Sequence, residues 1–190
     1  MPTQLNHDDG AMLRAEADIR SRLEGMELDF AALLAVSNIY RSATAIRNRM
    51  EREVLSEVGL SWGGFTILFV LWIWGPMEAT ALADECGLAK GTLTGMVGTL
   101  ESRQLVARDR VDSDRRRVRI GLSHEGSRLI ADVFPRFNSE ESKVVAGLDP
   151  ADIANLSGLL RVVTASADES TEVVAPLSQS RARQSRSVYR

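Results

Sequence analysis

The chain has 190 residues, enough for one ordinary domain with a hydrophobic core, or for one domain with arms. Its 23 Lys and Arg residues are nearly balanced by 26 Asp and Glu residues, which excludes a polycation that coats nucleic acid without direction. Positive charge is concentrated in a segment near residues 106–123 and in the C-terminal RARQSRSVYR. A local basic patch on an acidic body indicates directed docking.

The single cysteine, Cys86, excludes an intrachain disulfide and favours a reducing cytoplasm. The N-terminal MPTQLNHDDG lacks the regions of a signal peptide, and the most apolar run, Trp62–Trp74, is too short to cross a bilayer. We therefore expect a cytoplasmic protein without a membrane partner. We also expect no metal, cofactor or catalysis, because His7 and His124 are isolated and no nucleophile–base pair or phosphate loop appears.

The N-terminal part of the chain predicts one long helix. Residues 1–28 are expected to form an arm with at most a short helix. A long helix is predicted over 30–58, because Asp29 can cap it, apolar residues recur at helical spacing and Gly59 can end it. This helix has more apolar face than a small domain needs to bury, so we expect a partner subunit to cover the rest.

Three shorter helices follow. Ser61 is expected to cap WGGFTILFVLWIW, which Gly75-Pro76 stops. EATALADECGL and AKGTLTGMVGTLESRQL predict two more helices, separated by the Gly87-Leu88 turn. A helix, a tight turn and a second helix form a helix-turn-helix.

The segment 106–123 predicts a basic β-hairpin. VARDRV and RVRIGLS alternate apolar and polar residues on either side of a polar connection, DSDRR. Its cations are Arg108, Arg110, Arg115, Arg116, Arg117 and Arg119. A ribbon two strands wide with this charge suits a nucleic-acid groove.

Two helices are predicted after the hairpin. Ser123 caps the first, in which Pro135 is expected to cause a kink. Asp149-Pro150-Ala151-Asp152 is a helix start with a cap and a first-turn proline. Residues 167–190 are expected to form a disordered, basic tail. The predicted fold class is mainly α with a small β-hairpin, in which a wing follows the helix-turn-helix.

The segment from Gly59 to Gly126 resembles the MarR family of winged helix-turn-helix regulators. The residues that carry the resemblance are LSWGGFTILFVLW, ALADECGLAKGTLTGMVGTLESRQLVARDR and DSDRRRVRIGLSHEG. The last of these matches the family pattern Asp-x-Arg, a spacer, Leu-Thr/Ser and a Gly two residues further on, at Asp114, Arg116, Leu122, Ser123 and Gly126.

The resemblance implies a MarR-type domain over 29–166, with a winged-helix core at 60–123 and dimerisation helices at 29–58 and 124–166. It implies a homodimer that binds double-stranded DNA at a pseudo-palindromic operator, usually as a repressor, and implies no catalysis. Release by a small aromatic or phenolic effector, or by oxidation, is frequent in the family. Cys86 does not stand where the redox-sensing members carry their cysteine, so we interpret it as a small buried hydrophobe.

In the wing, the resemblance implies that Arg116 enters the minor groove and that Asp114 holds it in place. A guanidinium suits the negative potential of a narrow minor groove, and a carboxylate can fix its rotamer. Arg115 and Arg117 are expected to meet phosphates, and Arg108 is also expected to contact DNA. The alternative is an ordinary solvated charged hairpin.

The second helix of the motif is the recognition helix, and its outer face carries only small side chains. Leu93, Met96, Val97 and Leu100 share one face, and the opposite face holds Gly91, Thr92, Thr94, Gly95, Gly98, Thr99 and Ser102. Family members commonly carry long or polar side chains at two of these glycine positions. Either the backbone approaches the major groove closely, with Thr92 and Thr94 touching bases, or recognition relies on the wing and DNA shape. Lys90 would anchor a phosphate.

An aromatic cluster on the preceding helix, Trp62, Phe65, Phe69 and Trp72, is either core or the wall of an effector pocket, with Tyr40 and Arg41 as its polar end. Two rival functions stay open. One is a DNA-binding regulator without an effector, and the other is a winged-helix protein-interaction module.

Overall fold

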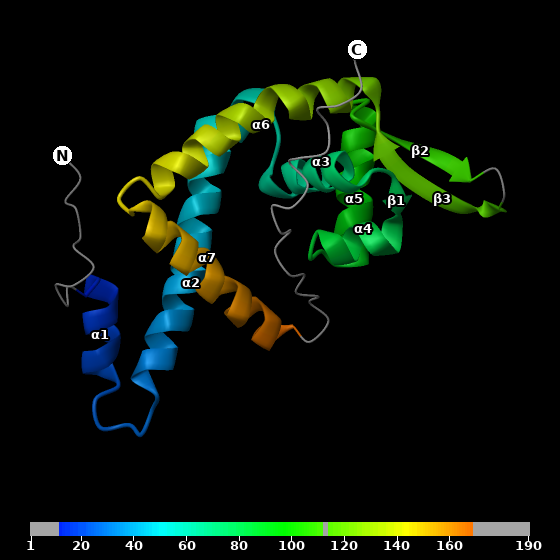
Figure 1. Ribbon diagram of the computed structural model, residues 1–190. Helices are drawn as coiled ribbons and strands as arrows, with labels where there is room; N and C mark the ends of the chain where they lie inside the picture. The colour runs from blue at the N-terminus through cyan, green and yellow to red at the C-terminus, as the bar shows by residue number, and fades with distance from the viewer. Residues whose placement is uncertain (1–11, 112–113, 169–190) are drawn as a thin grey trace, which may run out of the picture. The chain divides into compact units, whose positions relative to one another are not determined.

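The computed structural model describes residues 12–111 and 114–168, except for the side chains of residues 110–117 (Figure 1). The chain divides into two units, Met1–Val145 and Ala146–Arg190, and each is described by itself. The predicted tail, residues 169–190, and the first residues of the predicted N-terminal arm, 1–11, lie outside the described residues.

The first unit begins with a helical hairpin. A short helix, α1 (Arg14–Arg22), precedes the long helix α2 (Phe30–Met50). The Asp29 carboxylate accepts the N–H of Ala32 at 2.9 Å and so caps α2, as predicted. The two helices are joined through Glu16, whose carboxylate accepts from the side-chain amide of Asn38 at 2.6 Å.

The predicted helix over 30–58 is confirmed in extent, but its last two turns are not α-helical. The π-helix η1 (Glu51–Leu55) and the 3-10 helix η2 (Ser56–Val58) follow α2 without a break, and Gly59 ends the run with φ 61°. Val54 and Leu55 of η1 are both buried, so the irregular turn lies against the core.

Helix α3 (Trp62–Trp74) precedes the helix-turn-helix, which consists of α4 (Ala79–Glu85) and α5 (Lys90–Ser102). The Ser61 hydroxyl accepts the N–H of Gly64, which confirms the predicted cap of α3. Sequence analysis missed the two-residue strand β1 (Met77–Glu78) between α3 and α4. A strand this short shows no alternation of apolar and polar residues.

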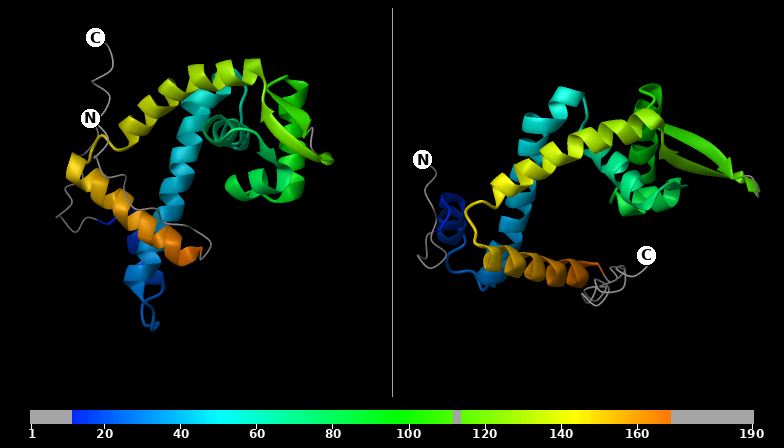
Figure 2. Two further views of the ribbon diagram at one scale, coloured as in Figure 1. Left: turned by 45° about the vertical axis from the view of Figure 1, so that its right-hand side comes forward. Right: turned by 45° about the horizontal axis from the view of Figure 1, so that its top comes forward.

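The predicted hairpin is confirmed as β2 (Val106–Val111) and β3 (Asp114–Leu122). With β1 it forms a three-stranded antiparallel sheet of order β1-β3-β2, in which Met77 pairs with Ile120 and Val106 with Leu122. Both views of Figure 2 show the hairpin projecting from the helices that surround its base.

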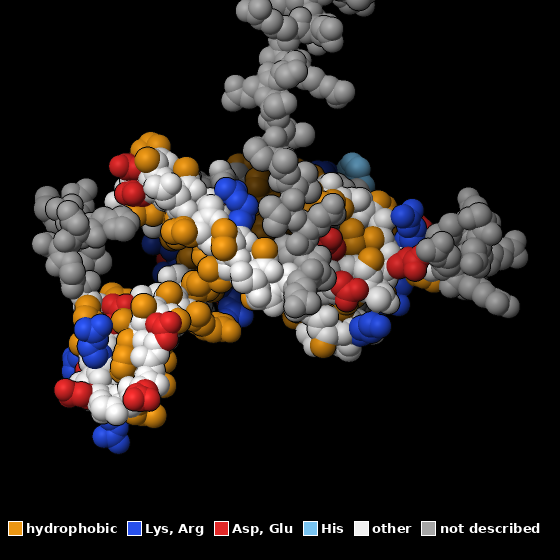
Figure 3. All heavy atoms as spheres, turned by 60° about the horizontal axis from the view of Figure 1, so that its bottom comes forward, with side chains coloured by type: hydrophobic (Ala, Val, Ile, Leu, Met, Phe, Trp, Pro, Cys, Tyr) orange, Lys and Arg blue, Asp and Glu red, His pale blue; other side chains and the backbone are white. Residues whose placement is uncertain are grey.

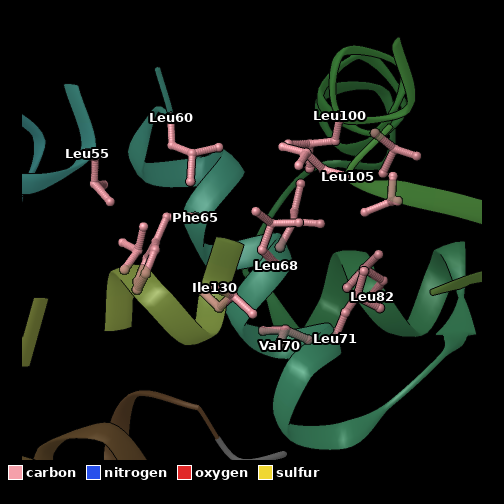
Figure 4. Close-up of a cluster of buried hydrophobic side chains, with 14 of the residues drawn as sticks. Leu55, Leu60, Phe65, Leu68, Val70, Leu71, Leu82, Leu100, Leu105 and Ile130 are labelled. Atoms are coloured by element: carbon pink, nitrogen blue, oxygen red, sulfur yellow. The ribbon is translucent and has the colours of Figure 1, made fainter. Parts of the chain in front are cut away.

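Helix α6 (His124–Val144) continues through Pro135 and packs against α3 and α2. Leucines, isoleucines and valines from α3, α4, α5, α6 and the sheet meet in one core around α3 (Figure 4). The buried face of α5 consists of Leu93, Val97 and Leu100, as its periodicity predicts, with Met96 packed partly buried beside it.

The second unit contains α7 (Pro150–Ala167), which begins at the predicted cap: the Asp149 side chain accepts the N–H of Asp152 at 2.8 Å. Among the described residues, no single helix is long and apolar enough to cross a membrane. The one helix pair with that length and composition, Phe30–Val58 with Trp62–Trp74, is bent by 78°.

Candidate nucleic-acid interface

The outer face of α5 is open to solvent and nearly flat. Thr92, Thr94, Gly95 and Thr99 are all exposed, and Lys90 stands exposed at the first position of the helix. Every predicted contact residue of this helix therefore lies on an accessible surface. Because none but Lys90 has a long side chain, a partner would reach the helix backbone more closely here than on an ordinary helix.

The glycines of this face have no packing role inside the protein. A Cβ atom added to Gly91, Gly95 or Gly98 would meet no atom within 4 Å, and none of the three has a positive φ. Each interior glycine nevertheless costs a helix about 0.5–1 kcal/mol relative to alanine. The folded chain alone therefore gives no reason for glycine at these positions.

Two of the three threonines of α5 use their hydroxyl protons within the helix. Thr94 Oγ1 donates to the carbonyl of Lys90 at 2.9 Å, and Thr99 Oγ1 donates to that of Gly95 at 3.1 Å. The hydroxyl oxygen keeps its lone pairs and the methyl group stays on the exposed face. These side chains suit contact with thymine methyls or with base donors.

The wing lies beside this helix, and one of its arginines is already paired. Arg108 Nε lies 3.2 Å from Glu101 Oε1 of α5, and the arginine side chain is 43% exposed. This ion pair joins the hairpin to the recognition helix. Asp114, Arg115, Arg116 and Arg117 belong to β3 by their backbone, but their side chains lie outside the described residues. Their predicted roles stay predictions.

The last two residues of the wing signature, Ser123 and Gly126, hold the base of the hairpin. Ser123 caps α6 by accepting the N–H of Gly126 at 2.9 Å, and its hydroxyl donates to the carbonyl of Gln104 at 2.5 Å. A Cβ atom on Gly126 would overlap the carbonyl oxygen of Leu105. Ser123 and Gly126 are therefore required by close backbone packing and not by contact with a ligand.

A hollow of about 360 Å³ opens between the recognition helix and the sheet. Its lining residues are Ala79, Leu93, Thr94, Val97, Arg108, Val118 and Ile120. The wall is mostly apolar and contains one guanidinium, from Arg108, and one hydroxyl group, from Thr94. That composition and volume match a site for a small molecule.

The four aromatic side chains of α3, which the sequence predicts as either core or the wall of an effector pocket, pack against α6. The ring centroids of Phe65 and Phe137 are 4.2 Å apart, and Phe69 and Trp72 lie 5.2 and 5.5 Å from Phe134. Trp62 approaches Phe137 at 5.9 Å. Only Phe65 is fully buried, and Trp72 is 39% exposed.

The predicted polar end of that pocket lies elsewhere on α2. Tyr40 is 72% exposed, and Arg41 donates to Asn38 Oδ1 at 3.5 Å, within the contact that holds α1. The structure therefore brings the four aromatic residues together and shows no contact between them and this pair.

Cys86 is half-buried after α4, and burial, reinforced by the nearby Glu85 carboxylate, raises the pKa of its thiol to about 11. A thiol with such a pKa is protonated at neutral pH, which disfavours reaction with oxidants. This agrees with the interpretation of Cys86 as a small apolar side chain.

Sequence reasoning missed Arg103, which follows α5 directly. Its Nη1 donates to the carbonyl of Gly59 at 2.5 Å and its Nη2 to that of Val58 at 2.8 Å. Nothing in the local sequence could have identified this contact, because it joins positions 44 and 45 residues apart.

Comparison with known proteins agrees with this geometry. Residues 60–118 match the model of the MarR family. The chain is 34% identical over 161 residues to the HTH-type transcriptional regulator YwaE of Bacillus subtilis, and the match covers 83% of this chain and 94% of YwaE.

Two solved structures share the fold. Sco3205 of Streptomyces coelicolor, a MarR family transcriptional regulator solved in complex with DNA, matches with a TM-score of 0.66, 21% identity and coverage of 75% of this chain and 91% of that one. BpsR of Bordetella bronchiseptica, whose DNA binding is regulated by 6-hydroxynicotinic acid, matches with a TM-score of 0.62, 21% identity and coverage of 69% and 98%. A winged helix-turn-helix with this sequence match identifies the chain as a transcriptional regulator of the MarR family.

Proposed function

We propose that this regulator binds an inverted-repeat DNA operator as a homodimer and represses transcription there until a small aromatic acid releases it. The observation that carries the DNA-binding part is the outer face of α5. It bears glycines that the fold itself does not need, and it lies beside an arginine-rich hairpin. A close approach of helix backbone to a DNA groove explains both features together.

Exposed apolar side chains support the homodimer. In the first unit, Val36 and Tyr40 of α2 are exposed by about half or more. In the second unit, α7 has no buried residue and exposes Leu156, Leu159, Leu160, Val162 and Val163. Apolar side chains also reach the surface between charged ones in Figure 3. A second copy that covers such faces would place two wings on one duplex, and sedimentation velocity is expected to show a dimer.

The hollow between α5 and the sheet is the site we propose for the effector. An aromatic ring fits among Leu93, Val97 and Ile120, and a carboxylate could exchange with Glu101 for the guanidinium of Arg108. A ligand there would occupy the space between the two DNA-contacting elements and hinder their docking. The finding that 6-hydroxynicotinic acid regulates DNA binding of BpsR supports an effector of this class.

The DNA-binding proposal is tested with a duplex selected by the protein from a random-sequence library. Arg116→Ala removes the predicted minor-groove contact from both wings and should weaken binding by roughly tenfold or more. Arg128→Ala is the matched control, because Arg128 is exposed on α6 and, within the part of the chain that the structure describes, forms an ion pair with Glu125 of its own helix alone. Equal affinity of the Arg116 variant and the control would remove the wing from the mechanism. If the wild-type protein selects no duplex at low salt, the protein-interaction module is favoured instead.

The effector proposal is tested by release of that duplex, followed by fluorescence anisotropy. Aromatic acids such as 4-hydroxybenzoate and 6-hydroxynicotinate are compared with uncharged benzyl alcohol. Because Arg108 is also a predicted DNA contact, release from each variant is measured at a protein concentration that gives equal initial occupancy of the duplex. Arg108→Gln should then abolish release by the acids, and Trp72→Leu, in the aromatic cluster, should leave it intact. Release that persists in Arg108→Gln and is lost in Trp72→Leu would indicate that the effector binds at the aromatic cluster instead. No release by any compound would support a regulator without an effector.

A further inference from the structure

Arg103 contacts the end of the long helix, and neither the proposed DNA contacts nor the proposed effector site involves this contact. The helix run from α2 to η2 ends at Val58, and the carbonyls of a helix end lack partners within the helix. The turn supplies two bonds of its own, from Gly59 N to Ser56 O and from Leu60 N to Leu55 O. Arg103 supplies the next two, from outside the helix.

This contact lies at the exposed surface, and its geometry favours a cation. The guanidinium donates to two consecutive carbonyls at once, and a cation at a helix C-terminus is favoured by the helix dipole. The backbone of Arg103 ends α5, where its N–H donates to the carbonyl of Thr99. One side chain therefore links the end of the recognition helix to the end of the long helix.

Apolar contacts hold the same corner from the other side. The side chain of Met96 lies against Gly63, where a Cβ atom would come within 2.7 Å of its terminal methyl group. Leu100 lies against Gly64 in the same way, at 3.8 Å from an added Cβ. A hollow of about 100 Å³ is lined by Met96, Leu100 and Arg103, so the apolar contacts and the guanidinium meet at one corner.

We propose that Arg103 is a positioning residue that fixes the angle between the recognition helix and the long helix, and thereby the spacing of operator half-sites that the dimer accepts. The inference depends on the proposed function, because it needs two recognition helices on one duplex. Dimeric helix-turn-helix proteins read half-sites about one DNA turn apart, roughly 34–36 Å. The joint between α5 and the helix that leads to the partner subunit must be rigid for that separation to be selective.

The test measures preference for spacer length with full-length protein. A duplex selected by the wild-type protein is compared with duplexes that have one or two base pairs inserted or removed between the half-sites. The wild-type protein should bind the altered duplexes more weakly. Arg103→Gln should reduce this discrimination by roughly threefold or more, since a charge-assisted contact at the exposed surface contributes a few-fold to an equilibrium constant. Arg128→Gln is the control and should discriminate between spacer lengths as the wild-type protein does.

Salt dependence separates positioning from a direct phosphate contact. A lost phosphate contact lowers the slope of log K against log salt by about one per subunit, and lysine would restore it. A lost positioning contact leaves the slope unchanged, and Arg103→Lys should restore discrimination only in part, because an ammonium cannot donate in the same fork. A reduced slope with unchanged spacer preference would overturn the inference, as would unfolding of both variants in thermal melts. If the wild-type protein selects no duplex, the proposed function fails together with this inference. If the wild-type protein discriminates between spacers and the Arg103 variants discriminate equally well, this inference fails alone.

Discussion

Replacing the glycines of the recognition helix with alanine should stabilise the protein and weaken its binding to DNA. Gly95 and Gly98 lie within α5, and an added Cβ meets nothing within 4 Å at either position. Each substitution should therefore recover about 0.5–1 kcal/mol of helix stability without creating an overlap. The double variant should gain about 1–2 kcal/mol, which for a chain of this size corresponds to an increase in Tm of roughly 2–8 °C.

The control is Gly75→Ala. Gly75 is also surrounded by open space, but it has φ 78°, in the left-handed region. An alanine there should destabilise the protein by about 1–2 kcal/mol. The comparison separates backbone conformation from available space, because both kinds of site are equally empty.

Thermal melts and urea titrations at one fixed protein concentration measure the stability change, and fluorescence anisotropy with the selected duplex measures affinity. If α5 approaches the groove through its backbone, the two methyl groups should reduce affinity by roughly tenfold or more. Unchanged affinity would instead support recognition by the wing and DNA shape. A double variant that is less stable than the wild type would refute the reasoning, because it would mean that the glycines have a role within the folded chain.

Three further results are expected. Gly126→Ala should destabilise the protein by about 3 kcal/mol or more in urea titrations, because its Cβ would overlap the Leu105 carbonyl; a neutral effect would show that the base of the wing can relax. The hydrogen bond from Asn38, with one from a backbone N–H, lowers the pKa of Glu16 below its ordinary 4.5. This contribution to stability is present above pH 4.5 and lost as pH falls. The protection factors of the α1 amides, which are corrected for the intrinsic exchange rate at each pH, should therefore fall in acid, and less so in Glu16→Gln. With its pKa raised from 9.0 to about 11, Cys86 should react with a disulfide reagent at pH 7.5 about 100-fold more slowly than an unperturbed thiol, and rapid labelling would contradict this.

The elements of the fold were predictable because local signals mark their ends. Asp29, Ser61, Ser123 and Asp149 each cap a helix as predicted, by a bond to the N–H three residues on. Caps depend on a few neighbouring residues, so a single sequence contains the information. The strand β1 lacks such a signal, since its two residues are defined by pairing with β3.

The candidate site was predictable only where local sequence patterns determine it. The exposed face of α5 follows from helical periodicity, and its residues are accessible as expected. The contact of Arg103 and the hollow beside Arg108 arise from elements that meet only in the folded chain. The predicted link of Tyr40 and Arg41 to the aromatic cluster is not seen, because Arg41 is engaged at Asn38 instead. Distances across the fold are not encoded in local patterns.

The π-helical turn at Glu51–Leu55 contains one residue more than the α-helical turn that it replaces. Because the turn is wider, it absorbs the extra residue locally, and the chain downstream keeps nearly the orientation that a regular helix would give it. Removal of one residue there should therefore leave a continuous helix with the DNA-reading half in place, whereas removal of one residue within α2 would rotate everything downstream by about 100°. Related chains with and without the extra residue at this turn would be expected to accept similar operators.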